Sequence, residues 1–497
     1  MLRSPAVPLA RPHTPQLAAD DARLAELGYR SQLLRGLRRF DNAAIGFATI
    51  SPVVGLYSVA AVGLGVAGPA WVWALPVALL GQCLLLAVYS ELASQFPIAN
   101  GSYQWSRRLL GNRYGWMTGW VALCGYIVAN TTVAYLSAPW TLSLLGIDPA
   151  PAALVAAGLV FVALCALVAA RGIGAVRRLV RVGIAAEAAV SIGVGLALLL
   201  AFTTQDFSLL TETLGAESTS GGSVTAGFLA ALAVAGWAFI GFDACVLSAE
   251  ETLDAARHVP RTIWIALLSV GALVILNAFA SVLAHPDPAL AVSGADADPF
   301  TTAVAASFGG WAGKPFTAVV LLAFLICGLA AQSSTARATF SMARDGALPA
   351  AQRLDRVDAR GVPITALAAT SALTGAGLLL GVEATAIGSL IAFGTAAIYL
   401  SFTLIATAAL IARLRGTWTP AGEVRLGRLG TPVNALAVGW LVFETVNIAW
   451  PRASLAPVGA PAYQVWAAPL VLLLIVASGL VYLQRARPDL AAERAPA

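Results

Sequence analysis

The stretch Phe239–Thr252, FIGFDACVLSAEET, decides the fold of this chain. It lies inside a long apolar run that begins near Phe228. Gly241 interrupts helical geometry within this run, and Asp243 places a carboxyl group at membrane depth. An ionisable group there costs roughly 3 kcal/mol on insertion scales, so we expect the segment to face protein or water rather than lipid.

A second interrupted apolar segment, Ala48–Tyr57 with the sequence ATISPVVGLY, lies near the start of the chain. Pro52 removes a backbone donor, and Gly55 weakens the turn that follows. Two broken apolar segments at matching places in two halves of a chain are the best sequence indicator of a transporter binding site. The alternative is a proline kink that holds no ligand.

The composition excludes an ordinary soluble protein. Of the 497 residues, 59% are hydrophobic and 11% are charged, whereas soluble proteins carry about 25% charged residues. Apolar runs long enough to cross a bilayer recur along the chain. We therefore predict an all-α polytopic membrane protein with twelve transmembrane helices, at 42–66, 70–94, 114–141, 151–170, 178–203, 225–249, 262–284, 313–341, 363–381, 385–412, 431–450 and 463–484.

The basic residues predict the orientation. Of the 30 Lys and Arg residues, all but Lys314 and Arg452 fall on one side of the twelve spans. Basic residues mark the cytoplasmic side, so we expect both termini to be cytoplasmic and the chain to lie in the plasma membrane. The net charge of +5 then reflects topology and contact with anionic lipid, and it indicates no nucleic acid partner.

The spans divide into two repeats of opposite orientation. We predict a five-plus-five inverted repeat, with discontinuous helices 1 and 6 and two appended helices. We expect residues 1–42 to be a disordered tail that runs into a short amphipathic stretch, Leu33–Phe40. The predicted parts are a tail at 1–41, repeats at 42–203 and 225–412, appended helices at 431–484 and a second tail at 485–497.

Three ordered motifs resemble the amino acid–polyamine–organocation superfamily of secondary transporters. They are YSELASQFPIANGSYQWSRRLLGNRYGWMTGW at Tyr89–Trp120, GFDACVLSAEETLDAARHVPRTIW at Gly241–Trp264, and TARATFSMARDGALP at Thr335–Pro349. The resemblance covers roughly residues 40 to 485. Within it, Gly-Phe-Asp before Ala-Glu-Glu-Thr resembles the amino acid/choline branch, although Leu247 stands where that branch often carries a histidine.

The resemblance implies that substrate is held between the unwound parts of spans 1 and 6. Unwound helices also leave backbone donors and acceptors free for a ligand. On this reasoning Gly55 and Leu56 offer amides to a carboxylate, while carbonyls at 48–51 and 239–240 hold an ammonium group or a cation. The predicted substrate-binding residues are Ile50, Ser51, Pro52, Val54, Gly55, Leu56, Phe239, Ile240, Gly241, Phe242, Asp243, Tyr126 and Asn130.

Structural roles compete with these assignments. Asp243 alternatively caps the following half-helix by accepting from the amide of Cys245 or Val246. Phe239 and Phe242 either gate the substrate or only pack in the core. Tyr126 and Asn130 share one helix face, where they either line the pocket or hydrogen-bond to a neighbouring helix. These alternatives stay open at the level of the sequence.

Candidate groups for a coupling ion are Ala48, Ser51, Ser333, Ser334, Glu187 and Asp243. The resemblance implies a sodium role for the two serines of span 8, which otherwise serve in packing and hydrogen bonding. Glu187 is a proton-coupling candidate because it is an acid within span 5, and otherwise pairs near the inner face. Inner-gate candidates are Glu250, Glu251, Arg257 and Arg261, whose alternative is a solvated loop face.

These features favour a secondary transporter, not an enzyme, that moves amino acids or related small amines by alternating access, with H⁺ or Na⁺ as the coupled ion. The alternative is a carrier of the same fold for nucleobases or inorganic ions. The five cysteines have no metal-ligand spacing and the chain has no Walker motif, so we expect no metal and no cofactor. Membrane lipid is an expected partner, and an oligomer stays open.

Overall fold

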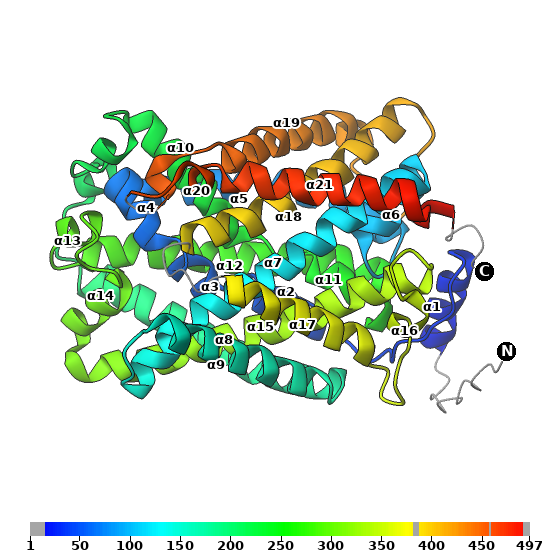
Figure 1. The fold of residues 1–497 in the computed structure, drawn as a ribbon, viewed down its shortest axis with the longest axis horizontal. Helices are drawn as coiled ribbons and strands as arrows, with labels where there is room; N and C mark the ends of the chain where they lie inside the picture. The colour runs from blue at the N-terminus through cyan, green and yellow to red at the C-terminus, as the bar shows by residue number, and fades with distance from the viewer. Residues whose placement is uncertain (1–14, 381–386, 457–458, 491–497) are drawn as a thin grey trace.

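The long helices of the molecule lie lengthwise beside one another in an elongated bundle (Figure 1). The computed structural model describes residues 15–380, 387–456 and 459–490. Within these residues the only pairing of the strand type is an isolated bridge between Leu37 and Thr252. The all-helical, multi-pass membrane architecture predicted from composition is therefore confirmed.

The longer helices are α2 Arg39–Ile50, α5 Ala74–Gln95, α6 Gly101–Leu110, α7 Asn112–Leu145, α8 Pro151–Ala169, α9 Ile173–Ala201, α10 Val224–Ala235, α12 Ala255–Ala284, α14 Pro299–Phe308, α15 Gly313–Arg344, α17 Ile364–Leu380, α18 Ile387–Leu414, α19 Gly430–Ala449 and α21 Ala467–Ala486. The other α-helices are α1 Pro15–Glu26, α3 Pro52–Tyr57, α4 Ala60–Ala67, α11 Ala244–Leu247, α13 Pro288–Val292, α16 Ala351–Leu354 and α20 Ala462–Val465. The tighter 3-10 turns are η1 Gly68–Trp73, η2 Phe207–Thr211, η3 Ala216–Ser220, η4 Gly236–Phe239, η5 Ala249–Glu251, η6 Gly310–Ala312, η7 Gly427–Leu429 and η8 Ala453–Leu455.

Ten helices within the described residues are long and apolar enough to cross a membrane. A shorter apolar helix, Ile364–Leu379, lies between two of them in sequence. The first predicted span, 42–66, is not one helix but is divided into α2, α3 and α4. The predicted ends of the spans at 381 and 385 lie outside the described residues.

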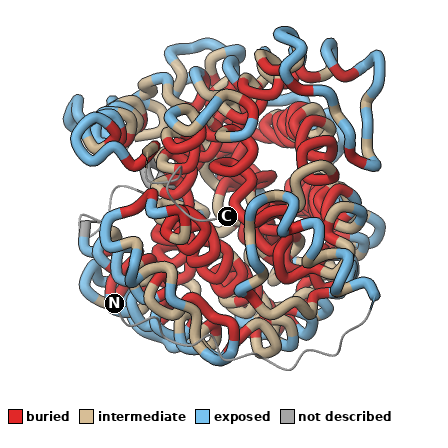
Figure 2. Tube along the Cα trace, turned by 90° about the vertical axis from the view of Figure 1, so that its right-hand side faces the viewer, coloured by how far each residue is buried: buried red, intermediate tan, exposed pale blue. Residues whose placement is uncertain are grey.

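The outer helices turn large apolar side chains away from the protein, as expected for contact with lipid. Examples are Val160 and Leu167 on α8, and Leu473 and Leu474 on α21, all of which are exposed. Viewed from the end that carries α1, the buried segments lie inside a ring of exposed ones (Figure 2).

The N-terminal segment differs from the predicted disordered tail. Residues 15–26 form α1, and residues 27–38 then run to α2 without helical structure. The predicted amphipathic stretch Leu33–Phe40 is partly buried in the protein instead, because Leu33 and Leu37 are only 1% and 0% exposed. The first fourteen and last seven residues of the predicted tails lie outside the described residues. Helix α1 and the end of α21 lie at the same end of the bundle (Figure 1).

Candidate functional site

A cavity lies where the two broken helices meet. One wall comes from α2, α3, η4 and α11, and the other comes from α7, α15 and α18. The lining residues are Thr49, Ile50, Val54, Tyr126, Ala129, Asn130, Val133, Trp237, Ile240, Gly241, Asp243, Ala244, Leu247, Cys327, Ala331, Ser334, Thr335 and Ile398.

The first break is at Ser51, which has φ of 51°. Pro52 follows as the first residue of α3, where its missing N–H costs nothing but prevents α2 from continuing. The Ser51 hydroxyl oxygen accepts from the Val54 amide at 3.1 Å, so Ser51 caps α3. The sequence therefore ends one helix and begins another within a single residue.

Glu187 of α9 binds two residues of the first break through its side chain. Its Oε1 accepts from the Ser51 hydroxyl at 2.5 Å and from the Val53 amide at 3.2 Å. The residue is 1% exposed, and its Oε2 has no hydrogen-bond partner within the described residues. A carboxyl group therefore already occupies the amide end of α3, on the side of the helix away from the cavity lining.

The second break is at Gly241, which has φ of 109°. A Cβ atom there would lie 3.0 Å from the carbonyl carbon and oxygen of Thr49, so both the backbone angle and the space require glycine. A Cβ on Gly55 would similarly lie 3.1 Å from the Cα and oxygen of Ala238. The two broken segments therefore pack backbone against backbone.

Asp243 lies at the second break, lines the cavity and is 5% exposed. Its side chain makes no capping bond to the following turn. Instead, its Oδ2 accepts a short hydrogen bond from the Tyr126 hydroxyl of α7. Asn130, one turn further along α7, donates to the Thr335 hydroxyl of α15 at 2.9 Å. Tyr126 and Asn130 thus line the cavity and also hydrogen-bond across helices, so the two readings of this pair are compatible.

The structure brings about half of the predicted substrate-binding residues to the cavity. The lining includes Ile50, Val54, Tyr126, Asn130, Ile240, Gly241 and Asp243. The remaining predicted residues, Ser51, Pro52, Gly55, Leu56, Phe239 and Phe242, lie behind this lining.

A physical reason explains why three of these residues do not line the cavity. The Gly55 amide is not free, because it donates to the Ser51 carbonyl at 2.9 Å within α3. Phe242 is 0% exposed and packs against Tyr89 and Phe402, with ring centroids 5.5 and 5.3 Å away, so it does not cover the cavity. Phe239 is also 0% exposed. The packing alternative is therefore the one that the structure supports for both rings.

The proposed ion groups are separated in the structure. Ser333 accepts from Arg337 at 2.7 Å, so its hydroxyl is already beside a cation. Ser334 lines the cavity, and its hydroxyl has no partner within the described residues. Ala48 is 0% exposed and lies outside the lining. Among these candidates, Ser51 and Glu187 are joined by a hydrogen bond between their side chains.

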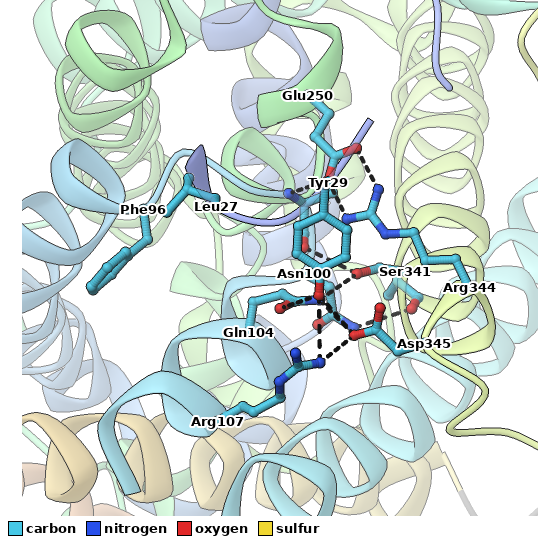
Figure 3. Close-up of polar contacts among 12 residues, drawn as sticks. Leu27, Tyr29, Phe96, Asn100, Gln104, Arg107, Glu250, Ser341, Arg344 and Asp345 are labelled. Carbon is cyan, nitrogen blue, oxygen red and sulfur yellow. Dashed lines mark hydrogen bonds and ion pairs between the residues drawn. The ribbon is translucent and has the colours of Figure 1, made fainter. Parts of the chain in front are cut away.

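Glu250 and Glu251, the acids of the predicted inner gate, pair with arginines of α15 and not with Arg257 or Arg261. Glu250 binds Arg344 of α15 through two hydrogen bonds of 2.8 and 2.6 Å (Figure 3). Glu251 pairs with Arg337 of the same helix. Arg257 and Arg261 are exposed instead. The acids of the predicted inner gate therefore form ion pairs, but with other bases: the side chains of Arg337 and Arg344 are buried beside these acids, whereas Arg257 and Arg261 are turned outward.

Several lining residues were missed by the sequence reading. They include Thr49, Trp237 and Ile398, together with Cys327, Ala331 and Thr335 on α15. On α15 the spacing of 327, 331, 334 and 335 is that of one helix face, a signal that starting from Ser334 would have revealed. No comparable signal marks Ile398, which reaches the cavity only through the packing of α18 on α7.

Comparison with known proteins agrees with this geometry. Residues 43–482 match the amino acid permease family. The chain is 27% identical over 481 residues to the amino-acid permease BAT1 of Arabidopsis thaliana, covering 88% of this chain and 90% of that one.

More distant relatives differ in the solutes that they are named for. The branched-chain amino acid permease BcaP of Lactococcus lactis is 25% identical over 338 residues, covering 65% of this chain and 71% of that one. The GABA-specific permease of Saccharomyces cerevisiae is 25% identical over 464 residues, covering 87% and 78%. The broken helices, the cavity between them and these similarities together show that the chain is a multi-pass membrane transport protein that belongs to the amino acid permease family.

Proposed function

We propose that the chain is a secondary active transporter that binds an amino acid or a related small amine in the cavity between the two breaks. One observation carries the substrate class: Asp243 is the only charged side chain among the lining residues that the structure describes. A buried, unneutralised carboxylate is costly, so a cationic partner stabilises it. An ammonium group is that partner in every amino acid and amine.

The rest of the lining suits an amino acid with an apolar or cationic side chain. Trp237, Ile240, Val133 and Ile398 supply apolar surface. Gly241 lines the cavity, and its amide has no backbone acceptor among the described residues, so this amide of the unwound segment is available to a substrate carboxylate. An acidic side chain would meet repulsion from Asp243 and no compensating base.

Glu187 is the proposed proton-coupling group. It joins the first break to α9, holds both Ser51 and Val53, and keeps one carboxyl oxygen unpartnered within the described residues. The amide end of α3 carries partial positive charge and attracts a carboxylate. A proton gained or lost at Glu187 therefore changes this attraction, and so changes the geometry of the first break. Sodium at Ser334 is the competing proposal for coupling.

Uptake and binding by an Asp243→Asn variant test the substrate assignment. Asn is nearly isosteric with Asp and retains an acceptor for Tyr126, but it lacks the negative charge. Uptake of the best substrate should fall at least tenfold, equivalent to about 1.4 kcal/mol. The substrate should also raise the melting temperature of the wild type but not of the variant.

The same thermal-shift screen decides between solute classes. Amino acids, polyamines, choline, nucleobases and inorganic ions are compared at equal concentrations, with and without sodium. Stabilisation by nucleobases alone would reject the ammonium assignment and favour the other carrier class. Wild-type uptake by Asp243→Asn would show that transport does not require the negative charge of Asp243.

Twelve spans in a five-plus-five inverted repeat, with both termini cytoplasmic in the plasma membrane, are part of the proposal. The support is the distribution of the basic residues and the location of α1 and the end of α21 at one end of the bundle (Figure 1). Single cysteines at Ser218 and Arg30, both exposed, test it with an impermeant thiol reagent. Ser218→Cys should react in intact cells, and Arg30→Cys only after the membrane is opened; the reverse pattern would invert the topology.

A further inference from the structure

The second half of α1 and the segment that joins it to α2 cross from one wall of the cavity to the other, at the end of the molecule that carries α1. We call the boundary between these two walls the seam. We call residues 20–37 the N-terminal strap. The cavity lies between a wall built from α2, α3, η4 and α11 and a wall that includes α15. The Glu250–Arg344 and Glu251–Arg337 pairs join η5, which follows α11 of the first wall, to α15 of the second. A path that opens between these two walls toward this end must separate the two pairs.

Both ends of the strap are held on the first side of the seam. At one end, Asp20 accepts from the Asp254 amide, just before α12, at 3.0 Å. Arg23 donates to the Gln95 carbonyl at the end of α5, also at 3.0 Å. At the other end, the amides of Gly36 and Leu37 both donate to the Glu251 carbonyl at 2.9 Å. The strap then continues directly into α2.

The middle of the strap is held on the opposite side. The Tyr29 hydroxyl lies 2.8 Å from Oδ2 of Asp345, directly after α15, and 3.0 Å from Oε1 of Gln104 on α6 (Figure 3). Arg107 binds the same Asp345 oxygen at 2.5 Å, so the hydroxyl joins an existing ion pair. A few residues further on, Leu33 is 1% exposed and belongs to a cluster with Phe340 of α15 and Ala366 of α17.

Tyr29 also contacts the Glu250–Arg344 pair itself. The guanidinium carbon of Arg344 lies 4.1 Å from the centroid of the Tyr29 ring, while the same guanidinium binds Glu250 (Figure 3). A cation over an aromatic face is an attractive arrangement, most so where water is excluded, and the Arg344 side chain is only 6% exposed. One side of Arg344 thus faces Glu250, and another faces the strap.

We propose that Tyr29 is a positioning residue of the cytoplasmic gate. The strap holds the two sides of the seam together, and Tyr29 must leave Asp345 and Arg344 before the cavity opens to the cytoplasm. This inference rests on the proposed transport through the cavity. This contact does not respond to physiological pH, because burial, and to a lesser extent the nearby Asp345, raise the pKa of Tyr29 to about 12. Its hydroxyl therefore stays protonated and able to donate to Asp345.

Cys327 provides a native reporter, since it lines the cavity on α15. Inside-out vesicles carrying the full-length protein are treated with an impermeant maleimide, and the modification of each cysteine is followed by peptide mass spectrometry. Cys165 is the internal reference because it is buried outside the cavity lining, 1% exposed. General unfolding would accelerate both cysteines, whereas opening of the gate accelerates only Cys327.

Tyr29→Ala should raise the labelling rate of Cys327 at least fivefold and leave Cys165 unchanged. Tyr29→Phe keeps the ring beneath Arg344 but loses the hydroxyl, so its rate should lie between wild type and Tyr29→Ala. Arg30→Ala alters the exposed neighbour of Tyr29 and should label at the wild-type rate. A substrate-induced thermal shift that persists in Tyr29→Ala would separate a failure of the gate proposal from a failure of the binding-site proposal.

The proposal is overturned if Tyr29→Ala labels Cys327 at the wild-type rate, or if Cys327 and Cys165 accelerate together. If Tyr29→Ala does not accumulate in the membrane, Tyr29→Phe decides alone. A labelling rate of Cys327 above that of the wild type in Tyr29→Phe supports the proposed role of Tyr29, and an equal rate rejects it.

Discussion

The two breaks differ in how each satisfies its backbone, although both interrupt an apolar helix. At the first, Ser51 and Glu187 occupy the amides at the start of α3, so the break is closed by side chains and faces α9. At the second, Gly241 makes the turn by its backbone angle alone, and Asp243 turns toward the cavity. A break that is already satisfied suits control by an ion, and a break with free polar groups suits a ligand.

The largest expected effect tests the backbone of the second break. Gly241→Ala adds a Cβ at φ of 109°, 3.0 Å from the backbone of Thr49. The left-handed conformation costs roughly 1–2 kcal/mol for a residue with a Cβ, and the clash adds to it. We expect uptake to fall roughly 100-fold, equivalent to about 2.8 kcal/mol.

Gly193→Ala is the matched control for this variant, because a Cβ there meets no atom within 4 Å and the residue lies inside α9. It should keep wild-type uptake in the same proteoliposome assay. Full activity of Gly241→Ala would mean that the second break tolerates a shift and that its geometry does not set the site.

Removing the Tyr126 hydroxyl tests how the second break holds its acid. Tyr126→Phe leaves Asp243 without the donor to its Oδ2. Hydrogen bonds to charged groups contribute about 1.5–3 kcal/mol, so a loss near 2 kcal/mol is expected. Apparent substrate affinity, measured as KM for uptake, should weaken roughly 30-fold. An unchanged KM would show that the substrate, and not Tyr126, orients Asp243.

Glu187→Gln tests whether the first break senses a proton. Gln retains a carbonyl oxygen for the Ser51 hydroxyl and the Val53 amide, so the fold of the break should persist. The side chain no longer ionises, and uptake should fall about tenfold, equivalent to about 1.4 kcal/mol. Its dependence on external pH should also flatten. A wild-type pH profile in this variant would show that Glu187 is not the proton-coupling group.

The smallest expected effect concerns Ser51 itself. Ser51→Ala removes the cap on Val54 and the donor to Glu187. Loss of an N-cap costs about 1 kcal/mol, which should appear as a melting temperature lower by a few degrees. Uptake should fall by less than in Glu187→Gln, because the carboxyl still accepts from Val53. A larger loss than in Glu187→Gln would make the hydroxyl the functional group of the pair.

Local chemistry explains which parts of the site could be predicted from the sequence. The positions of both breaks followed from Pro52 and Gly241, because these residues act on their own backbone. Asp243 and Glu187 stood out because ionisable groups are rare at membrane depth. The N-terminal segment was misjudged as disordered, because its polar composition hides Leu33 and Leu37, which are buried only against distant helices.

The partners of those residues depended on the tertiary structure. Tyr126 meets Asp243 and Ser51 meets Glu187 across 117 and 136 residues of chain. Arg344 rather than Arg261 pairs with Glu250, although Arg261 is far nearer in sequence. Sequence by itself determined where the helices break and where charge enters the membrane, since covalent geometry and hydrophobicity are local. Only the packing of α7, α9 and α15 decided what each broken end faces, since that packing alone brings side chains from remote segments within bonding distance.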